Sequence, residues 1–296
     1  MRKMRKEQSD MNYFFEKERK LPVKYEVDVL VAGSGPAGVG AAIAAGRAGV
    51  KTLLIEKSGS IGGMSTTGLM SHFTGTVDCK LYKEVLERQR IEENRDCAWH
   101  YINPEALQIT YIKMLREAGV EILLYTTIAD VICENNTVNG VIIESKNGRE
   151  VVLAKRVIDG TGDGDVAAKA GVKYTLGREG DGKMQPATLM FKVGGVDCDR
   201  AVFPESFETL VDTEKGELQS LARKYLTAPM GHVLLYRTST SGVVTVNMTN
   251  VVGVDGTKTE DLTRAKLESQ LQTSEIVKFL REYAPGYEKC YLLETA

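Results

Sequence analysis

Hydrophobic and polar positions alternate in residues 26–57 in a way that predicts a strand, a turn, a helix and a second strand. The run EVDVLVA is rich in β-branched residues and is typical of a buried strand. It ends in GSGPAG, and the small residues of VGAAIAAGRAG then predict a closely packed helix. Because KTLLIEK supplies a second strand, the segment has the order of one βαβ unit with a right-handed crossover.

Two more helices are predicted next. Leucines and charged residues in residues 81–95 are spaced as in an exposed helix. Another helix is expected to begin at Asn103, a favoured N-cap residue, with Pro104 at its first position and Glu105 in its first turn. It is expected to end at Gly119, and VEILLY follows as a buried strand.

The next part of the chain has the pattern of a small antiparallel sheet. Strand-like runs in residues 126–154, separated by Glu-Asn-Asn and Lys-Asn-Gly, predict a three-stranded β-meander. Residues 156–159 (RVID) are then expected to return to the main sheet. The segment GTGDGD then leads into a short helix, VAAKAG.

The pattern changes after Gly177. The segments ATLMFKVGG and GVVTVNMTNVVGVDGT alternate like strands, whereas residues 208–226 and 259–281 have helical spacing. We therefore expect three parts. These are an N-terminal arm (residues 1–25), an α/β domain with an inserted β-meander (residues 26–180), and a second, α+β domain (residues 181–296).

Composition narrows the class of partner. The 296 residues carry 38 Lys and Arg against 40 Asp and Glu, so no basic excess is present for nucleic acid to bind. Residues 29–46 are uncharged over a length that could span a membrane, but five glycines and a proline argue against a spanning helix. We expect a small-molecule substrate, no nucleic acid and no membrane span.

Cysteine usage indicates the compartment. The five cysteines are odd in number, widely spaced and without a CxxC pair, which favours reduced thiols over zinc or a disulfide framework. The first twenty residues contain no apolar run of signal-peptide length. We therefore expect a cytoplasmic protein.

The segment from Gly33 to Gly38 matches GxGxxG in an informative context. It follows a predicted strand and opens a helix, and Glu56 lies eighteen residues after Gly38 at the end of the next strand. Gly33 permits the tight turn, Gly35 lets a pyrophosphate approach the backbone, and Gly38 lets the helix pack on the strand. The free N–H groups of the helix N-terminus suit the phosphates. The sequence thus predicts a Rossmann-like dinucleotide-binding domain.

Glu56 indicates which dinucleotide is excluded. Its carboxylate can accept hydrogen bonds from the adenosine ribose and would repel a 2′-phosphate, which disfavours NADP. A second glycine pair follows in KSGSIGGMST. A dehydrogenase that uses NAD alone is disfavoured, because this glycine pair and GTGDGD would then have no role in cofactor binding.

With the second glycine pair added to the first glycine turn, the chain resembles the superfamily of FAD-dependent oxidoreductases with a glutathione-reductase-like flavin domain. The segments VEILLYTTIADV, VIDGTGDGDVAAKAG, GKMQPATLMFKVGGVD and NMTNVVGVDGT look like those of members related to fumarate reductase flavoproteins. The resemblance covers about residue 26 to the end. It implies an FAD cofactor and hydride transfer between a small organic substrate and flavin N5.

The resemblance also implies which residues hold FAD. The pyrophosphate would meet the first glycine turn, the adenosine an acidic strand end, and the flavin side the second glycine pair. In that order these residues are Gly33, Gly35, Pro36, Ala37 and Gly38; Glu56 and Lys57; and Gly62, Gly63, Met64 and Ser65. The backbone of Ile128 would meet adenine, and Thr161, Gly162 and Asp163 would lie beside the pyrophosphate.

The chain departs from this family at its end. Such flavoproteins finish with a late glycine-rich segment that binds the isoalloxazine, whereas this sequence stops at YLLETA. We expect a truncated member or a fragment that binds FAD weakly or not at all unless a partner or a homo-oligomer completes the site. The rival hypothesis is a non-catalytic dinucleotide-binding module or one part of an assembly.

Three residues are candidates for catalysis or for contact with the substrate. His72, seven residues after Ser65, could act as a proton donor near the flavin, with a hydrogen-bonded loop histidine as the plainer interpretation. Gln185, before Pro186, is a candidate for contact with substrate or flavin. Arg237 could bind a substrate carboxylate, with a solvated arginine as the alternative.

The remaining histidines and a run of aspartates are interpreted as structural. His100 and His232 lack any partner motif. Asp159, Asp163 and Asp165 have the spacing of metal ligands, but the glycines between them fit a turn beside phosphate better. We therefore predict no metal site.

Overall fold

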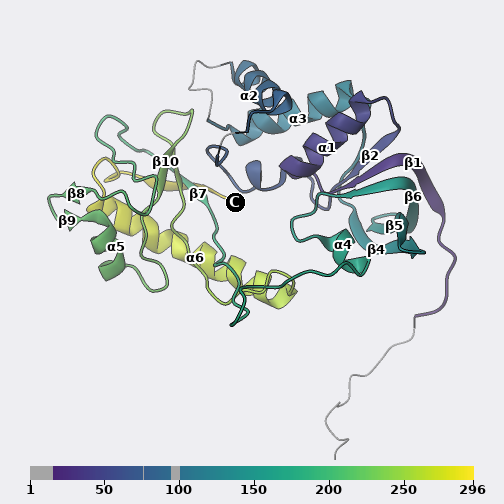
Figure 1. Ribbon diagram of the computed structural model, residues 1–296. Coiled ribbons are helices and arrows are strands. Elements are labelled where there is room, and N and C mark those ends of the chain that lie inside the picture. The colour runs from purple at the N-terminus through teal and green to yellow at the C-terminus, as the bar shows by residue number, and fades with distance from the viewer. Residues whose placement is uncertain (1–15, 76, 95–100) are drawn as a thin grey trace, which may run out of the picture.

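The predicted βαβ unit forms at the start of the folded chain. It consists of β1 (Val23–Ala32), α1 (Pro36–Arg47) and β2 (Thr52–Ile55). The structure is a computed structural model that describes residues 16–75, 77–94 and 101–296 (Figure 1). Strand β1 begins at Val23, so the last residues of the predicted arm belong to the sheet.

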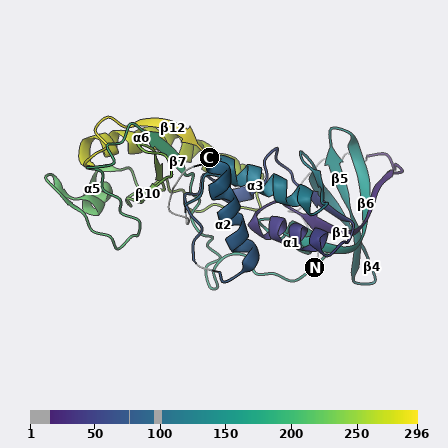
Figure 2. The same ribbon diagram turned by 90° about the horizontal axis from the view of Figure 1, so that it is seen from above.

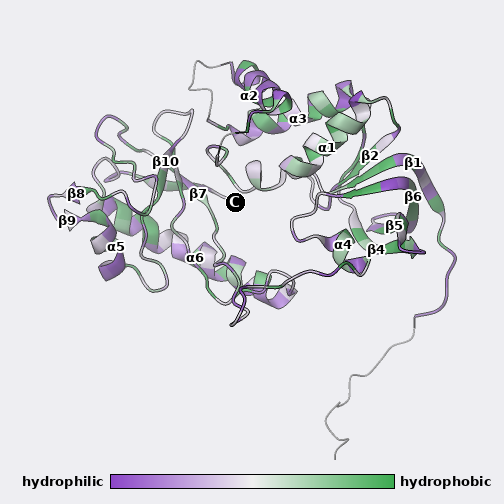
Figure 3. Cartoon of the chain, in the orientation of Figure 1, coloured by the Kyte–Doolittle hydropathy of each residue, from purple (hydrophilic) through white to green (hydrophobic). Residues whose placement is uncertain are grey.

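The first lobe is built on a six-stranded sheet. Its strand order is β3-β2-β1-β6-β5-β4, and β1 pairs in parallel with both β2 and β6. Side chains alternate between its faces. Val31 and Leu54 pack with α1, whereas Leu30 and Leu53 belong to a second cluster. Figure 3 shows hydrophobic residues on β1 and β2 beside α1.

Three helices are associated with the α1 side of the sheet (Figure 1). Besides α1 they are α2 (Lys80–Glu93) and α3 (Pro104–Glu117). Helix α3 begins where the sequence predicts, because the side-chain oxygen of Asn103 accepts hydrogen bonds from the backbone N–H groups of Glu105 and Ala106. The chain then turns at Gly119 (φ +70°) into β3 (Glu121–Leu123).

The meander forms, and its last strand continues into the main sheet. It consists of β4 (Thr127–Glu134), β5 (Thr137–Ser145) and β6 (Gly148–Asp159). The run REVVLA, predicted as the third meander strand, and residues 156–159, predicted to return to the main sheet, form one continuous strand, β6. Twelve residues are long enough for β6 to pair antiparallel with β5 at its start and in parallel with β1 up to Asp159.

Short elements complete this lobe and begin the second. A 3₁₀ turn, η1 (Gly63–Ser65), begins at the second glycine of the Gly62–Gly63 pair, and α4 (Asp165–Lys169) begins at the last residue of GTGDGD. An antiparallel sheet in the order β10-β11-β7-β12 then forms the second lobe. Its strands are β7 (Phe191–Gly194), β10 (Leu235–Arg237), β11 (Val244–Val246) and β12 (Tyr291–Thr295).

The helices of the second lobe differ in part from the prediction. Helix α6 (Thr259–Tyr283) agrees with it, but of residues 208–226 only α5 (Leu218–Tyr225) is helical. A small hairpin of β8 (Asp212–Thr213) and β9 (Gly216–Glu217) precedes α5. Gly216, at φ +129°, and the carboxylate of Glu217, which accepts from the backbone of Gln219 and Ser220, set the helix start there.

The two lobes have separate hydrophobic cores and lie side by side in two views (Figures 1 and 2). In the second lobe, Phe191, Ile276 and Tyr287 are fully buried between the sheet and its helices. The chain passes between the lobes through residues 170–187. No helix in the described ranges combines the length and hydrophobicity needed to cross a lipid bilayer.

Candidate functional site

Three glycine segments converge at the carboxyl ends of β1 and β6. The N–H of Gly160 donates to the carbonyl of Ala32 at 2.8 Å. A Cβ on Gly33 would lie 2.7 Å from the carbonyl oxygen of Gly160, and a Cβ on Gly38 would lie 1.8 Å from that of Gly33. Neither position has room for a side chain, because backbone faces backbone there.

The second glycine pair touches the first turn. The N–H of Gly62 donates to the carbonyl of Ser34 at 2.8 Å, and a Cβ on Gly63 would lie 2.9 Å from the Cα of Gly35. Gly35 differs from its neighbours, since nothing lies within 4 Å of a Cβ built there. No side chain caps α1 at Gly35, which leaves backbone donors of its first turn for another acceptor.

Glu56 ties the end of β2 to the first glycine turn. Its Oε2 accepts from the backbone N–H (2.9 Å) and hydroxyl (2.8 Å) of Ser34, and its Oε1 accepts from the N–H of Ser58 at 2.8 Å. Burial of this side chain, which is 8% exposed, works to raise the pKa of Glu56. The hydrogen bonds from Ser58 and Ser34 outweigh it and hold that pKa below its usual value.

These contacts change the role expected of Glu56. Its donors within the chain were not apparent from the motif. A carboxylate offers about four acceptor sites, so one remains for an incoming hydroxyl after these three bonds. Glu56 is therefore a structural clamp as well as a candidate ribose ligand.

Residues on either side of these turns have contrasting surroundings. Lys57 is exposed, and Met64 is 66% exposed. Ser65 is buried and donates to the carbonyl of Gly62 at 2.6 Å. Burial raises the pKa of Tyr111 to about 12, opposed by its hydrogen bond with Ser65. Ser65 thus fixes the second glycine segment, whereas Met64 extends toward solvent.

Asp159 organises the third glycine segment. Its Oδ1 accepts from the backbone N–H (3.0 Å) and hydroxyl (2.7 Å) of Thr161, and its Oδ2 accepts from the N–H of Ala167 at 2.8 Å. Gly162 and Asp163 are exposed. Among the described residues, no group of three His, Cys, Asp or Glu side chains is placed to hold a metal ion.

The start of β4 lies beside Glu56. The N–H of Thr126 donates to the carbonyl of Glu56 at 2.9 Å, and Ile128 follows two residues later in this edge strand. The position proposed for adenine is therefore next to the candidate ribose ligand. This adjacency depends on pairing between distant segments, which the local sequence pattern does not specify.

His72 lies where the two lobes meet. Its Nδ1 is hydrogen-bonded to the hydroxyl of Ser71 at 3.0 Å, and its ring centroid is 5.1 Å from that of Tyr236 in the second lobe. Sequence reasoning did not single out Tyr236. Burial raises the pKa of Tyr236, a hydrogen bond with Asn247 lowers it, and the charge of Glu205 raises it further.

The other two catalytic candidates are exposed. Arg237 follows Tyr236, and its guanidinium lies 3.7 Å from the ring centroid of Phe203. Gln185 lies on the segment that joins the lobes and is exposed. His232 packs edge-on against Phe207, and His100 lies outside the described residues.

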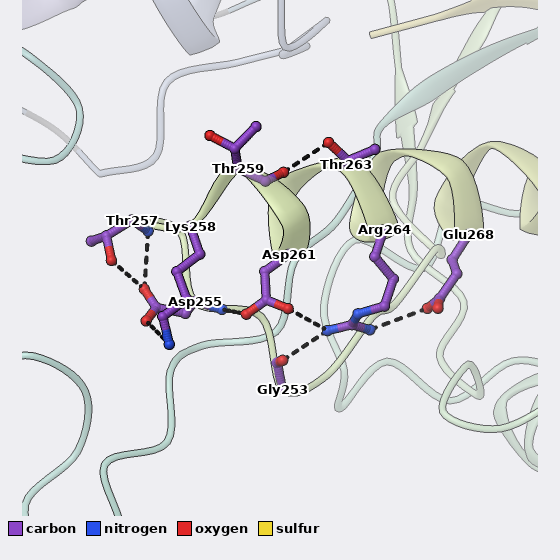
Figure 4. Close-up of polar contacts among 9 residues, drawn as sticks. All are labelled: Gly253, Asp255, Thr257, Lys258, Thr259, Asp261, Thr263, Arg264 and Glu268. Carbon is purple, nitrogen blue, oxygen red and sulfur yellow. Dashed lines mark hydrogen bonds and ion pairs between the residues drawn. The ribbon is translucent and has the colours of Figure 1, made fainter. Parts of the chain in front are cut away.

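A shallow hollow on α6 is separate from the glycine turns. It has a volume of about 580 Å³ and is lined by Thr259, Glu260, Thr263, Arg264, Leu267 and Glu268. Figure 4 shows Arg264 held between Asp261, Glu268 and the carbonyl of Gly253. With its guanidinium engaged in this way, Arg264 orders the loop before α6, and we assign the hollow no ligand.

Comparison with known families decides what this arrangement represents. Residues 28–296 match the family described as FAD dependent oxidoreductase. The chain belongs to the FAD-dependent oxidoreductase family. The resemblance inferred from its glycine motifs is thereby confirmed, and FAD is the cofactor that this membership indicates.

Relatives of this family member include thiamine thiazole synthases. The chain is 30% identical over 174 residues to that of Pyrococcus horikoshii, covering 54% of this chain and 67% of the relative. It is 34% identical over 169 residues to that of Methanococcus vannielii, covering 52% of this chain and 61% of the relative. The aligned regions thus cover about two thirds of these relatives.

Solved structures confirm the Rossmann-like fold of this family member. A geranylgeranyl bacteriochlorophyll reductase-like protein from Thermoplasma acidophilum gives a TM-score of 0.59 at 19% identity, covering 92% of this chain and 65% of its own. The p-nitrophenol 4-monooxygenase of Pseudomonas putida gives a TM-score of 0.56 at 12% identity, covering 92% of this chain and 68% of its own. These likenesses concern the fold alone.

The described residues fit the phosphates of the family's cofactor. The first turn of α1 has no side-chain cap, and Gly35 has open space where a side chain would otherwise stand. A pyrophosphate needs this combination of free backbone donors and close approach. The carboxylate of Glu56, the candidate ribose ligand, accepts two hydrogen bonds from Ser34, the residue before Gly35.

Proposed function

We propose that this chain is an FAD-dependent oxidoreductase that binds the ADP portion of FAD at the turn between Gly33 and Gly38. The observation that carries the proposal is the open position at Gly35, above an uncapped helix N-terminus and against the Gly62–Gly63 backbone. Glycines that cannot carry a side chain surround it, so the turn is fixed while one approach remains open.

Each part of FAD is assigned residues on this basis. The pyrophosphate meets the backbone of Gly35, Pro36, Ala37 and Gly38, with Thr161, Gly162 and Asp163 beside it. Glu56 accepts from the ribose, while Lys57 and the backbone of Ile128 flank the adenine. The segment Gly62, Gly63, Met64 and Ser65 leads toward the flavin, with Ser65 holding it in place.

The proposed chemistry is redox transfer with a small organic substrate. FAD, when bound, supplies a hydride acceptor or donor at flavin N5. Because Ser71 engages Nδ1 of His72, we assign Nε2 of that ring to proton exchange with the substrate. Arg237, beside the lobe contact, is assigned to a substrate carboxylate, and Gln185 remains the weaker candidate for a substrate contact.

Substitutions at Gly35 and Gly38 test the cofactor site. Gly35→Ala adds a methyl group to open space at φ −63°, so the fold should keep its stability to within about 0.5 kcal/mol. The methyl group occupies the phosphate approach, so ADP affinity in calorimetric titration should fall at least about tenfold, or about 1.4 kcal/mol. Gly38→Ala, the control, should destabilise the fold itself by its clash with Gly33.

The outcomes separate the proposal from its rivals. Undiminished ADP binding by Gly35→Ala would contradict the phosphate assignment. FAD that binds more tightly than ADP, and whose absorbance bleaches with a substrate, supports the oxidoreductase. Equal affinity for FAD and ADP without bleaching favours a non-catalytic nucleotide-binding module or part of an assembly.

A second candidate function comes from the relatives. Matches of 30% and 34% identity to thiamine thiazole synthases favour a role in making the thiazole of thiamine. Growth of a strain that lacks its thiazole synthase, restored by this chain without added thiazole, would support that role. A complemented strain that loses growth with Gly35→Ala would link the role to the same nucleotide site.

We also propose a cytoplasmic location. Cys79 and Cys133 are exposed and unpaired, and Cys198 and Cys290 are likewise free. Exposed thiols persist in a reducing compartment. The cysteine at position 97 lies outside the described residues.

A further inference from the structure

Tyr125 has an unusual backbone conformation next to the candidate ribose site. It lies between β3 and β4 at φ +54°, in the left-handed region that bulky residues rarely adopt. Its side chain is 71% exposed, so burial of the ring does not explain the conformation. Strained backbone of this kind is often found at ligand sites.

Backbone hydrogen bonds hold Tyr125 against the segment that follows β2. Its N–H donates to the carbonyl of Ser58 at 3.1 Å, and the next residue, Thr126, donates to the carbonyl of Glu56 at 2.9 Å. The N–H of Glu56 in turn donates to the carbonyl of Leu123 at 2.9 Å. The tyrosine is therefore fixed beside the carboxylate that is assigned to the ribose.

The phenol ring lies on a glycine. A Cβ on Gly59 would be 2.3 Å from the Oη of Tyr125 and 2.5 Å from its Cε1 and Cζ. Any other residue at position 59 would displace the ring. The ring is thus supported by Gly59, while most of its surface faces solvent.

We propose that Tyr125 is the aromatic contact for the adenine base of the bound nucleotide. The inference rests on the proposed function, which places the ribose at Glu56 and the base edge at the backbone of Ile128. An exposed, fixed ring at this place offers a flat surface to the base. Base–aromatic contacts of this kind change affinity by about fivefold to more than a hundredfold when the ring is removed.

Tyr125→Gly separates a binding role from a structural one. Glycine adopts φ +54° without strain, so the thermal midpoint should stay the same or rise. The loss of the ring should weaken ADP binding about tenfold. Because stability and affinity move in different directions, weaker binding in this variant does not reflect unfolding.

Companion variants and a second ligand sharpen the test. Tyr125→Phe should bind ADP within about threefold of the unchanged protein, because stacking needs the ring and not the hydroxyl. Gly59→Ala should weaken ADP binding by displacing the ring. Inorganic pyrophosphate, which has no base, should bind the unchanged protein and Tyr125→Gly equally.

Tyr291 supplies a matched control. It is an exposed tyrosine whose ring also lies on glycines, Gly194 and Gly195, but in the second lobe. Tyr291→Ala should leave ADP affinity unchanged. An effect on ADP as large as that of Tyr125→Gly would remove the specificity of the result and overturn the inference.

The decisive comparison is calorimetric titration of the full chain with ADP. If the unchanged protein binds ADP and Tyr125→Gly binds it equally well, the inference is overturned and the proposed function stands. If Tyr125→Gly loses affinity for ADP and for pyrophosphate equally, the inference is also overturned, because the base is then not involved. If the unchanged protein binds no ADP, the proposed function fails and this inference fails with it.

Discussion

At the scale of single residues, Glu56 shows how much a motif specifies. Its place at the end of the second strand is apparent from the spacing to the glycine turn. Its bonds to Ser34 and Ser58 are not, because the first joins residues 22 positions apart and depends on β1 and β2 lying in parallel. The same carboxylate therefore stabilises the turn and offers an acceptor to a ligand.

Glu56 should make stability depend on pH. Hydrogen bonds hold its pKa in the fold below the unfolded value, near 4.3 for glutamate, so its contribution is full above that value. The contribution is lost as pH falls through the lower folded pKa. Glu56→Gln should reduce the free energy of unfolding by about 1–2 kcal/mol at pH 7, and the difference should shrink below about pH 4.

Urea unfolding of both proteins at several pH values measures this difference. Glu87→Gln, at an exposed position on α2, is the control and should leave stability nearly unchanged at every pH. A difference between Glu56→Gln and the unchanged protein that persists at low pH would show that the charge is not responsible.

At the scale of elements, the sequence predicts a helix boundary correctly where a neighbouring residue supplies the hydrogen-bond partner. The side-chain oxygen of Asn103 accepts hydrogen bonds from the backbone N–H groups of Glu105 and Ala106, which have no partner within α3. The sequence therefore predicts the helix start correctly. The helix expected over residues 208–226 is wrong in its first half, because the β8–β9 hairpin competes with it. Residues 156–159 return to the main sheet as predicted, because pairing of β6 with β1 continues past Lys155 and Arg156.

Removal of the α3 cap should have a measurable cost. Asn103→Ala loses the acceptor for Glu105 and Ala106 and should lower the free energy of unfolding by about 1 kcal/mol. Asn103→Asp keeps the acceptor and should retain most of the stability in chemical denaturation. Equal losses in both variants would point instead to the bond from Asn103 to Glu93.

At the scale of the whole molecule, two cores are joined by one passage of the chain. Among the described residues, the mixed sheet of the first lobe and the antiparallel sheet of the second share no strand. The contact of His72 with Tyr236 links them. Because no hydrophobic cluster in the described part of the chain spans both lobes, each lobe is expected to open by itself.

Core substitutions should therefore act on one lobe at a time. Leu54→Ala in the first lobe and Ile276→Ala in the second each remove a fully buried side chain, which costs about 2–5 kcal/mol. Hydrogen exchange read by mass spectrometry should show faster exchange in the lobe that carries the substitution. Equal acceleration in both lobes would show that the molecule unfolds as one unit.

The sequence by itself determined the βαβ unit, the glycine turn, the α3 cap and the membership that these motifs indicate. Each depends on local spacing or on backbone freedom at a single glycine. Only the tertiary structure decided that Gly62–Gly63 and Gly160 close around the turn, that Tyr125 lies on Gly59, and that His72 meets Tyr236. Local patterns report which residues are buried or turned, whereas these contacts depend on how distant strands pair and how the lobes pack.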